Sequence, residues 1–256
     1  MDNLEKIAVL IDADNTQLSK LEDVIREVSK HGRIVVKRAY GNWKKETLKN
    51  WENELKRLAI KAEQQFDYVS GKNATDIALV IDAVNLLHKG LYDAFVIVAS
   101  DSDYTPLAIN LHESGVYVMG VGEQKTPESF KNSCDEFVFL ENISGKVTES
   151  QNDNIAFEHK TKSKETKAIR EESQNIDAIH NLLKIAADTY QDDEGYVNVS
   201  AAGAYIKRAK PDFDARTFGY TKLPDLIKDF PEKYKIKRYP GKGTVTIVAY
   251  KCIEKR

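Results

Sequence analysis

Short, wholly apolar runs alternate with amphipathic stretches through residues 1–145, and few folds accommodate that alternation. Residues 7–11 read Ile-Ala-Val-Leu-Ile without a polar side chain, as a strand covered on both faces requires. Apolar side chains then recur at helical spacing between residues 18 and 28, and Gly32 follows as a stop signal. Strands that alternate with helices of this length connect by right-handed crossovers. We therefore expect an α/β domain with a mainly parallel sheet flanked by helices.

The same periodicities assign the elements of this domain. Strands are expected at residues 7–11, 34–36, 66–69, 95–99 and 116–121, with an edge strand at 137–140. Helices are expected at residues 18–28, 44–62, 77–87 and 106–113. The third of these helices has an apolar stripe of Ile77, Val80, Ile81, Val84 and Leu87. For Trp43 and Trp51, core packing is favoured over stacking on bases.

Apolar periodicity disappears at residues 146–174, which are rich in Lys, Glu, Ser, Thr and Asn. Such a stretch cannot bury enough surface to fold alone, so a polar linker is expected. Beyond it, helices are expected at residues 176–186, from 200 onwards and at 223–230, with a hairpin at 234–239 and 244–249. Three helices followed by a terminal hairpin are the layout of a winged helix-turn-helix.

Composition and the amino-terminal residues exclude several classes of protein. No run approaches the roughly 18 apolar residues that a membrane span needs, and residues 1–6 lack the basic-then-apolar order of a signal peptide. Cys134 and Cys252 lie far apart, so neither a disulfide framework nor a zinc knuckle is expected. The expectation is a cytoplasmic protein that makes no membrane contact.

Charge is distributed unevenly along the chain. Residues 1–146 carry more Asp and Glu than Lys and Arg, and residues 175–256 carry the reverse. A basic segment can neutralise the phosphates of a nucleic acid. In the expected hairpin, Tyr234 and Tyr239 are interleaved with the candidate RNA-binding residues Lys233, Lys235, Lys237, Arg238 and Lys242. Such a pattern suits single-stranded RNA, although a solvated hairpin face with its tyrosines packed inward explains it equally well.

Carboxylates follow two of the expected strands. Asp12 and Asp14 come directly after the first strand, and Asp101 and Asp103 come after the fourth. The carboxyl ends of parallel strands meet at one edge of a sheet, and Asp76, in the first turn of the third helix, faces the same edge. Carboxylates brought close together repel one another unless a cation neutralises them. A hard dication suits oxygen ligands, and metal-activated water can attack a phosphodiester.

Each aspartate also has a purely structural interpretation. Asp14 or Asn15 could cap the first helix, and Asp103 could cap the helix that contains Pro106. The convergence of acidic residues from two strand ends and a facing helix start favours a functional site.

Four segments resemble the NYN domain, a branch of the PIN-like nucleases that is also known as the LabA-like proteins. They read VLIDADN at residues 9–15, YGNW at 40–43, GKNATDIAL at 71–79 and VASDSDYTPL at 98–107. The resemblance spans residues 4–142 and implies a Rossmann-like, PIN-type sheet that cleaves RNA with Mg²⁺ or Mn²⁺. One departure is Asn42, where the family often has aspartate. PIN-like domains often dimerise, so the resemblance also implies a homodimer.

The NYN resemblance also implies roles for individual residues. Asp12, Asp76 and Asp101 would be the principal catalytic, metal-binding carboxylates, with Asp103 as a fourth ligand or an outer partner. Asn15 would orient Asp12 or contact phosphate, and Lys72 would reach a phosphate oxygen. The expected substrate-binding residues are Asn15, Lys72, Ser100 and Thr105.

Residues 176–248 resemble the LOTUS (OST-HTH) domain, a winged-helix module. The resemblance is carried by GYV at residues 195–197, SAAGAYIK at 200–207, FDARTFGY at 213–220 and LPDLI at 223–227. It implies RNA binding or, in some members, docking of a protein partner. The predicted domains are an NYN nuclease domain at residues 1–145, a polar linker at 146–174 and a LOTUS domain at 175–251.

The expected function is hydrolysis of RNA phosphodiester bonds, chiefly in single-stranded RNA, by a metal-dependent ribonuclease with a C-terminal RNA-binding module. One alternative is an RNA-binding adaptor with an inactive nuclease-like domain, although retention of four aspartates argues against it. Another is an Asp-nucleophile phosphatase, because residues 12–16 match the Asp-x-Asp-x-Thr opening of haloacid-dehalogenase-like enzymes. Those enzymes need an extended turn and flap after the motif, whereas helical periodicity here begins by Leu18.

Overall fold

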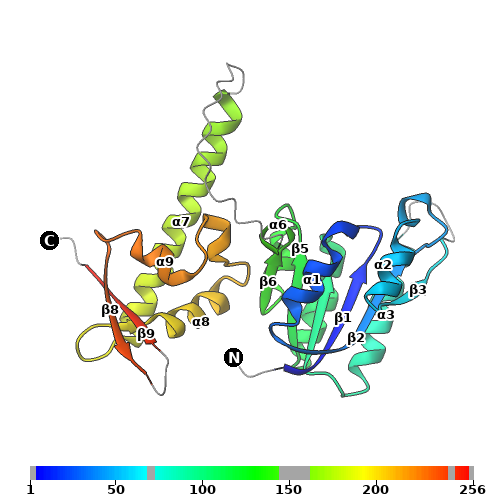
Figure 1. Cartoon of the computed structure of the whole chain (residues 1–256), viewed down its shortest axis with the longest axis horizontal. Helices are drawn as coiled ribbons and strands as arrows, with labels where there is room; N and C mark the ends of the chain where they lie inside the picture. The colour runs from blue at the N-terminus through cyan, green and yellow to red at the C-terminus, as the bar shows by residue number, and fades with distance from the viewer. Residues whose placement is uncertain (1–3, 68–72, 144–161, 242–245, 254–256) are drawn as a thin grey trace. The chain divides into compact units, whose positions relative to one another are not determined.

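The computed structural model describes residues 4–67, 73–143, 162–241 and 246–253. The chain divides into two compact units, Met1–Gly145 and Lys146–Arg256 (Figure 1). Each unit has a buried apolar core of its own, as separate domains do. Among the described residues, no helix is both long enough and apolar enough to cross a membrane.

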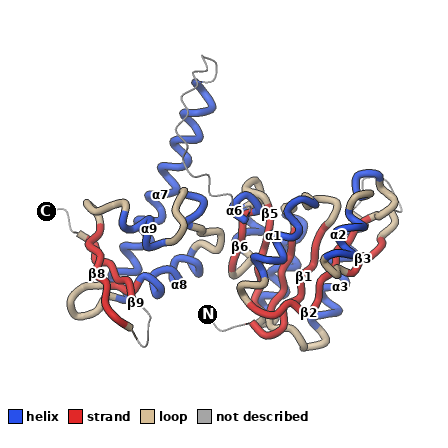
Figure 2. Tube along the Cα trace, in the orientation of Figure 1, coloured by secondary structure: helices blue, strands red, loops and turns tan. Residues whose placement is uncertain are grey.

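Unit 1 is built on a six-stranded sheet, whose strands are red in Figure 2. Every neighbouring pair of its strands is parallel. The order is β3-β2-β1-β4-β5-β6. The strands are β1 (Leu4–Asp12), β2 (Gly32–Gly41), β3 (Lys61–Gln64), β4 (Ala94–Val98), β5 (Tyr117–Gly122) and β6 (Glu136–Phe139). Residues 7–12 of β1 and all of β4 are buried. Burial on both faces explains the unbroken apolar runs, and the predicted parallel α/β sheet is confirmed.

Helices cover both faces of this sheet. One face packs against α1 (Leu21–Val28), α2 (Trp51–Arg57) and α6 (Leu140–Ile143). The other face packs against α3 (Ala74–Leu87), α4 (Thr105–Glu113) and α5 (Glu128–Asn132). Three short 3₁₀ turns, η1 (Leu18–Lys20), η2 (Glu46–Leu48) and η3 (Ser102–Tyr104), precede α1, α2 and α4.

The predicted helix at residues 44–62 and the predicted strand at 66–69 are both displaced in the structure. Helical structure is confined to η2 and α2, and it ends before Ala59, which has a left-handed backbone conformation (φ 50°). Residues 61–64 then form β3, an edge strand whose side chains are mostly exposed. Exposure removes the apolar run by which an inner strand is recognised. Residues 66–67 lie in a loop, and residues 68–69 lie outside the described part of the chain.

The apolar stripe predicted for the third helix is only partly the face that α3 buries. Leu79, Ala83 and Leu86 are buried against the sheet, whereas Ile77 and Ile81 are 58% and 57% exposed. The prediction was wrong because α3 is apolar on nearly every side. Periodicity identifies the buried face only when the opposite face is polar.

The strand order reverses between β1 and β4. From β1 the chain adds β2 and β3 on one side, and β4, β5 and β6 extend the sheet on the other. In open parallel sheets, ligands bind outside the carboxyl ends of the strands at such a switch point. Because Ile11 of β1 pairs with Val98 of β4, the segments that follow these two strands leave the sheet side by side. They carry Asp12 and Asp101.

Unit 2 combines three helices with a three-stranded antiparallel sheet of order β7-β9-β8. Its elements are α7 (Lys162–Tyr190), β7 (Val197–Asn198), α8 (Val199–Ala209), η4 (Ala215–Phe218), α9 (Leu223–Lys228), β8 (Tyr234–Pro240) and β9 (Thr246–Cys252). Leu183, Ile206, Leu226 and Tyr250 lie in its core. The predicted winged-helix layout is confirmed, and β7 is a strand that the sequence pattern did not indicate.

Helix α7 begins at Lys162, inside the stretch that was predicted to be linker. Residues 162–174 are mostly Lys, Glu, Arg, Ala, Ser and Gln, and most of these are good helix formers. Extending an existing helix costs far less free energy than nucleating a new one, so the buried turns around Ile179 and Leu183 support the polar turns before them. The polar composition therefore predicted a lack of helix wrongly for residues 162–174.

Candidate functional site

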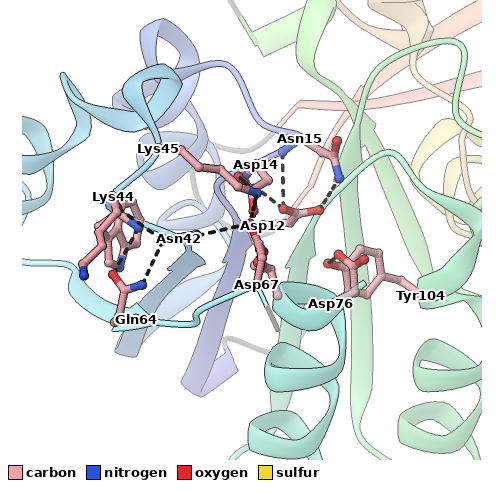
Figure 3. Close-up of polar contacts among 12 residues, drawn as sticks. Asp12, Asp14, Asn15, Asn42, Lys44, Lys45, Gln64, Asp67, Asp76 and Tyr104 are labelled. Atoms are coloured by element: carbon pink, nitrogen blue, oxygen red, sulfur yellow. Dashed lines mark hydrogen bonds and ion pairs between the residues drawn. The ribbon is translucent and has the colours of Figure 1, made fainter. Parts of the chain in front are cut away.

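The carboxylate of Asp12 ends the central strand β1 and is 0% exposed. Its Oδ1 accepts hydrogen bonds from the backbone N–H groups of Asp14 (3.1 Å) and Asn15 (3.3 Å). Its Oδ2 accepts a hydrogen bond of 2.9 Å from Nδ2 of Asn15 (Figure 3). Asn15 therefore orients Asp12, which is one of the two roles expected for it.

Tyr104 joins Asp12 to Asp76 across the edge of the sheet. Its side chain is fully buried, and its hydroxyl donates a hydrogen bond of 2.7 Å to Oδ1 of Asp76 (Figure 3). The same hydroxyl also interacts with Asp12. Since a phenol has one proton to donate, it serves one carboxylate at a time. The sequence placed Tyr104 in a family motif but carried no local signal for this bridging position.

The carboxylates of the cluster act on one another electrostatically. Burial raises the pKa of Asp12 to about 6 against the hydrogen bond from Asn15, and repulsion by Asp76 contributes to the increase. Burial also raises the pKa of Asp76, and Asp101, Asp103 and Asp14 add to that increase through repulsion. Negative charge is therefore concentrated at this edge, and a bound dication would relieve it.

Asp101 and Asp103 lie on the exposed side of the cluster. Oδ1 of Asp101 accepts a hydrogen bond from the backbone N–H of Asp103 (3.1 Å) and so caps η3. Oδ2 of Asp103 accepts a hydrogen bond of 2.6 Å from Nδ2 of Asn73, just before α3. Both carboxylates are therefore held at the edge, where they are exposed and close enough to Asp76 to raise its pKa.

The helix-capping interpretation fails for the residues to which it was applied. Gln17 and Lys20 stand at the N-caps of η1 and α1, and neither cap has a side-chain hydrogen bond. Tyr104, rather than Asp103, stands at the N-cap of α4. Asp14 and Asn15 therefore have tasks other than capping the first helix.

Asp14 is neutralised from a distant part of the chain. Its carboxylate oxygens lie 3.2 Å from Nζ of Lys45, and Oδ2 accepts a hydrogen bond of 3.0 Å from the hydroxyl of Thr75. Lys45 also lies 3.3 Å from Asp67. The sequence near Asp14 does not predict the contact with Lys45, because the two residues are 31 positions apart.

The donor set at this edge fits a hard dication in one particular way. Among the described residues, no three His, Cys, Asp or Glu side chains have the arrangement of a metal site. Mg²⁺, however, is usually held by one or two carboxylates together with water and substrate phosphate. Asp12 and Asp76, which share the Tyr104 hydroxyl, fit that description. The structure does not bring all four aspartates together around one point.

The other expected substrate-binding residues are engaged within the domain or lie outside its described part. The hydroxyl of Ser100 accepts a hydrogen bond of 2.9 Å from the backbone of Glu123. Oγ1 of Thr105 lies 3.5 Å from Oγ of Ser129. Lys72 lies outside the described residues.

The segment that follows Asp12 also bears on the phosphatase alternative. β1 ends at Asp12 and η1 starts at Leu18, so the flap required by Asp-nucleophile phosphatases has no room there. In addition, the second aspartate of the motif, Asp14, is ion-paired with Lys45. Residues 12–16 therefore match that motif in sequence but not in structure.

In unit 2, the expected RNA-binding side chains lie on or next to β8. Lys235, Lys237 and Arg238 are exposed on the strand, and Lys237 lies 2.5 Å from Glu194. Lys233, just before the strand, lies 5.2 Å from the centre of the Phe230 ring. Lys242 lies outside the described residues. Of the two interleaved tyrosines, Tyr234 packs inward at 5% exposure, so it is a core residue and not a stacking platform.

Comparisons with known proteins agree with this division of the chain. The model of the NYN domain matches residues 6–141, and that of the OST-HTH/LOTUS domain matches residues 170–246. No curated protein matches the chain. A solved protein of unknown function from Vibrio parahaemolyticus RIMD 2210633 is 18% identical over 54% of this chain and 94% of its own, with a TM-score of 0.45. An uncharacterized protein from Nitrosomonas europaea is 22% identical over 44% of this chain and 93% of its own, with a TM-score of 0.28. The NYN match covers more than half of the whole chain. The chain therefore belongs to the NYN domain family, and it carries an OST-HTH/LOTUS domain after the NYN domain.

Proposed function

We propose that this protein hydrolyses phosphodiester bonds of single-stranded RNA with Mg²⁺ or Mn²⁺ held by Asp12 and Asp76. The two domains support a nuclease or RNA-binding role. In the proposal the NYN domain cleaves, and the OST-HTH/LOTUS domain retains the RNA. Asp101 and Asp103 act at the solvent side of the same site, where they bind the dication directly or through water.

The observation that carries the proposal is the fully buried carboxylate of Asp12 beside Asp76. A buried carboxylate that serves only structure is normally compensated by a cation as well as by hydrogen bonds, whereas Asp12 has hydrogen bonds but no ion pair among the described residues. Here repulsion from Asp76 adds to the cost of burial, and the pKa of Asp12 rises to about 6. Lys45, the nearby cation at this edge, is paired with Asp14 and Asp67 instead. Such a perturbed pair at a switch point is typical of a functional site.

Bound at this pair, a dication would lower the pKa of a coordinated water and offset the charge of the phosphate. Residues of the chain hold the two carboxylates in place. Asn15 holds both oxygens of Asp12 through its backbone and side-chain N–H groups. Tyr104, which is itself fully buried, holds one oxygen of Asp76.

A cleavage assay tests the proposal directly. The full chain should cut a labelled single-stranded RNA when Mn²⁺ or Mg²⁺ is added and should stop when EDTA is added. Asp12→Asn and Asp76→Asn should each lose more than the roughly 10- to 100-fold that loss of an outer partner of a metal site costs. Asp93→Asn is the matched control, because Asp93 accepts a hydrogen bond from the backbone of Lys6 at the opposite edge of the sheet. Equal cleavage by all three variants would refute the proposed site.

The second candidate is an RNA-binding adaptor without nuclease activity. One observation favours it: no three potential ligands in the described residues have the arrangement of a metal site. An adaptor would bind RNA with and without dications and would leave it intact under every condition of the same assay.

A further inference from the structure

A groove opens beside the carboxylate cluster, between the loop that contains η2, helix α2 and strand β3. Its volume is about 380 Å³. Leu48 and Leu55 contribute to an apolar floor, and Trp43 forms part of its wall. Among its lining residues, lysines outnumber glutamates by four to two. The glutamates pair with exposed lysines across single turns, and such pairs contribute little in water. Lys45 is engaged by Asp14 and Asp67, so Lys44 is the groove lysine that forms no ion pair with a carboxylate among the described residues. An aromatic wall beside such a lysine suits a single-stranded nucleic acid.

The groove is continuous with the carboxylate cluster through Lys45. This side chain lines the groove and also contacts Asp14 at 3.2 Å (Figure 3). Asp14 in turn accepts the hydrogen bond from Thr75, which directly precedes Asp76 in α3. A chain that enters the groove therefore leads toward the edge where Asp12 and Asp76 lie.

Trp43 is held in place without being buried. Its indole Nε1 donates a hydrogen bond of 3.1 Å to the backbone carbonyl of Glu63, and its ring lies 6.1 Å from that of Trp51. Trp51 is only 3% exposed, whereas Trp43 is half-buried. An aromatic ring that is fixed along one edge and partly open to solvent can receive a base at low entropic cost.

Asn42 shapes the loop that carries Trp43 and the groove lysines. Its Nδ2 donates to Asp67 (3.1 Å), and its Oδ1 accepts from the backbone N–H of Lys44 (3.3 Å) and from Nε2 of Gln64 (3.1 Å). An aspartate at this position, as the related family often has, would place a second negative charge against Asp67. The asparagine therefore keeps Lys44 and Lys45 at the mouth of the groove.

We propose that this groove binds the RNA nucleotides next to the scissile phosphate, with a base stacked on Trp43 and the backbone contacted by Lys44. The assignment of a scissile phosphate rests on the proposed function, whereas binding in the groove can be tested without it. Lys44 is exposed at the rim, 5.0 Å from the centre of the Phe66 ring, where its ammonium group can turn toward a phosphate.

Intrinsic fluorescence isolates this groove from the rest of the protein. The chain has two tryptophans, Trp43 and Trp51, and both lie in unit 1. RNA that contacts only the OST-HTH/LOTUS domain, which contains no tryptophan, makes no contact with either fluorophore. Titration of the full chain with a short oligouridylate in EDTA should quench the fluorescence to saturation. Trp43→Phe should remove most of the quenching, and Trp51→Phe should retain it, with circular dichroism verifying the fold of each variant.

Charge variants test the backbone contact. Lys44→Ala should weaken the quenching titration and lower the dependence of log affinity on log salt concentration by about 0.7, the value for one single-strand phosphate contact. Lys89→Ala, at an exposed position just after α3, should change neither quantity. If oligouridylate binds by anisotropy without Trp43-dependent quenching, or if both lysine variants behave alike, the proposal is overturned.

The same titration separates this proposal from the proposed function. Quenching that depends on Trp43 in a protein that never cleaves RNA supports the groove and rejects catalysis. Cleavage with Mn²⁺ in a protein that shows no Trp43-dependent quenching supports catalysis and rejects the groove.

Discussion

The hydroxyl of Tyr104 donates a 2.7 Å hydrogen bond to Asp76 and also reaches Asp12, so one buried phenol connects the carboxylates of β1 and α3. Tyr104 and Asp76 are 28 positions apart in the sequence. Tyr104 itself lies at the start of α4, where the chain has just left the neighbouring strand β4. The position of Asp76 therefore depends on a third segment that packs beneath it.

Tyr104→Phe should impair the site with little change to the apolar core. The variant keeps the ring that packs near Phe130 but removes the donor to Asp76, which is half-buried, and a hydrogen bond to a charged group contributes about 1.5–3 kcal/mol. We expect a fall in cleavage of about 10- to 100-fold, as for other residues that orient a ligand. Steady-state cleavage of a labelled RNA measures it. Tyr92→Phe, in the same core beside Phe95, is the control, and equal rates for both variants would contradict the prediction.

Asp12→Asn should stabilise the metal-free protein at neutral pH. The pKa of Asp12 is raised from 3.8 to about 6 in the folded state, so the folded protein holds this proton more tightly than the unfolded chain. Stability is consequently lost as the pH rises from about 4 to 6 and stays lower above that range. Asparagine does not ionise, and its advantage should reach at most about 3 kcal/mol above pH 6. Urea unfolding with EDTA at pH 4 and pH 7 measures it. An advantage that is equal at both values would show that ionisation of Asp12 is not its cause.

The OST-HTH/LOTUS domain should lose stability as the pH falls through the range where histidine titrates. Burial lowers the pKa of His180 below 6.5, and the charge of Lys233 adds to the effect. The unfolded chain therefore binds the proton more readily, so the stabilisation present above pH 6.5 is lost as the pH decreases. Differential scanning calorimetry can follow this transition, since tryptophan fluorescence identifies that of unit 1. His180→Gln should flatten the pH dependence of the unit 2 transition, and the exposed His88→Gln should not.

Removal of residues 146–256 should weaken RNA binding and spare the chemistry. Unit 1 has its own core, so the shortened protein should still cut short oligonucleotides at high concentration. On long RNA, the loss of a second binding domain should reduce affinity by roughly 100-fold or more. Electrophoretic mobility shifts in EDTA measure the affinity. Lys235→Ala with Lys237→Ala in the full chain should reproduce part of the loss, and an unchanged affinity in the shortened protein would refute the division of labour.

The sequence by itself determined which strands are buried and where the carboxylates of the site leave them. The apolar run at residues 7–11 required a strand covered on both faces, and the residue that follows it, Asp12, had to lie at the carboxyl edge of the sheet. The same argument placed Asp101 after β4. Both inferences depend only on neighbours in the chain, because the period of a strand or helix records which of its faces are covered.

Only the tertiary structure decided which side chains meet at that edge. Tyr104 reaches Asp76, and Lys45 neutralises Asp14, through contacts between segments that crossovers of the fold bring together. Edge strand β3 and the buried face of α3 were misjudged for a related reason. An exposed strand and a helix that is apolar on nearly every side have no clear period that distinguishes one face from the other. The apolar period of a segment indicates which of its faces is buried. Hydrogen bonds and ion pairs between distant segments depend instead on how the crossovers pack.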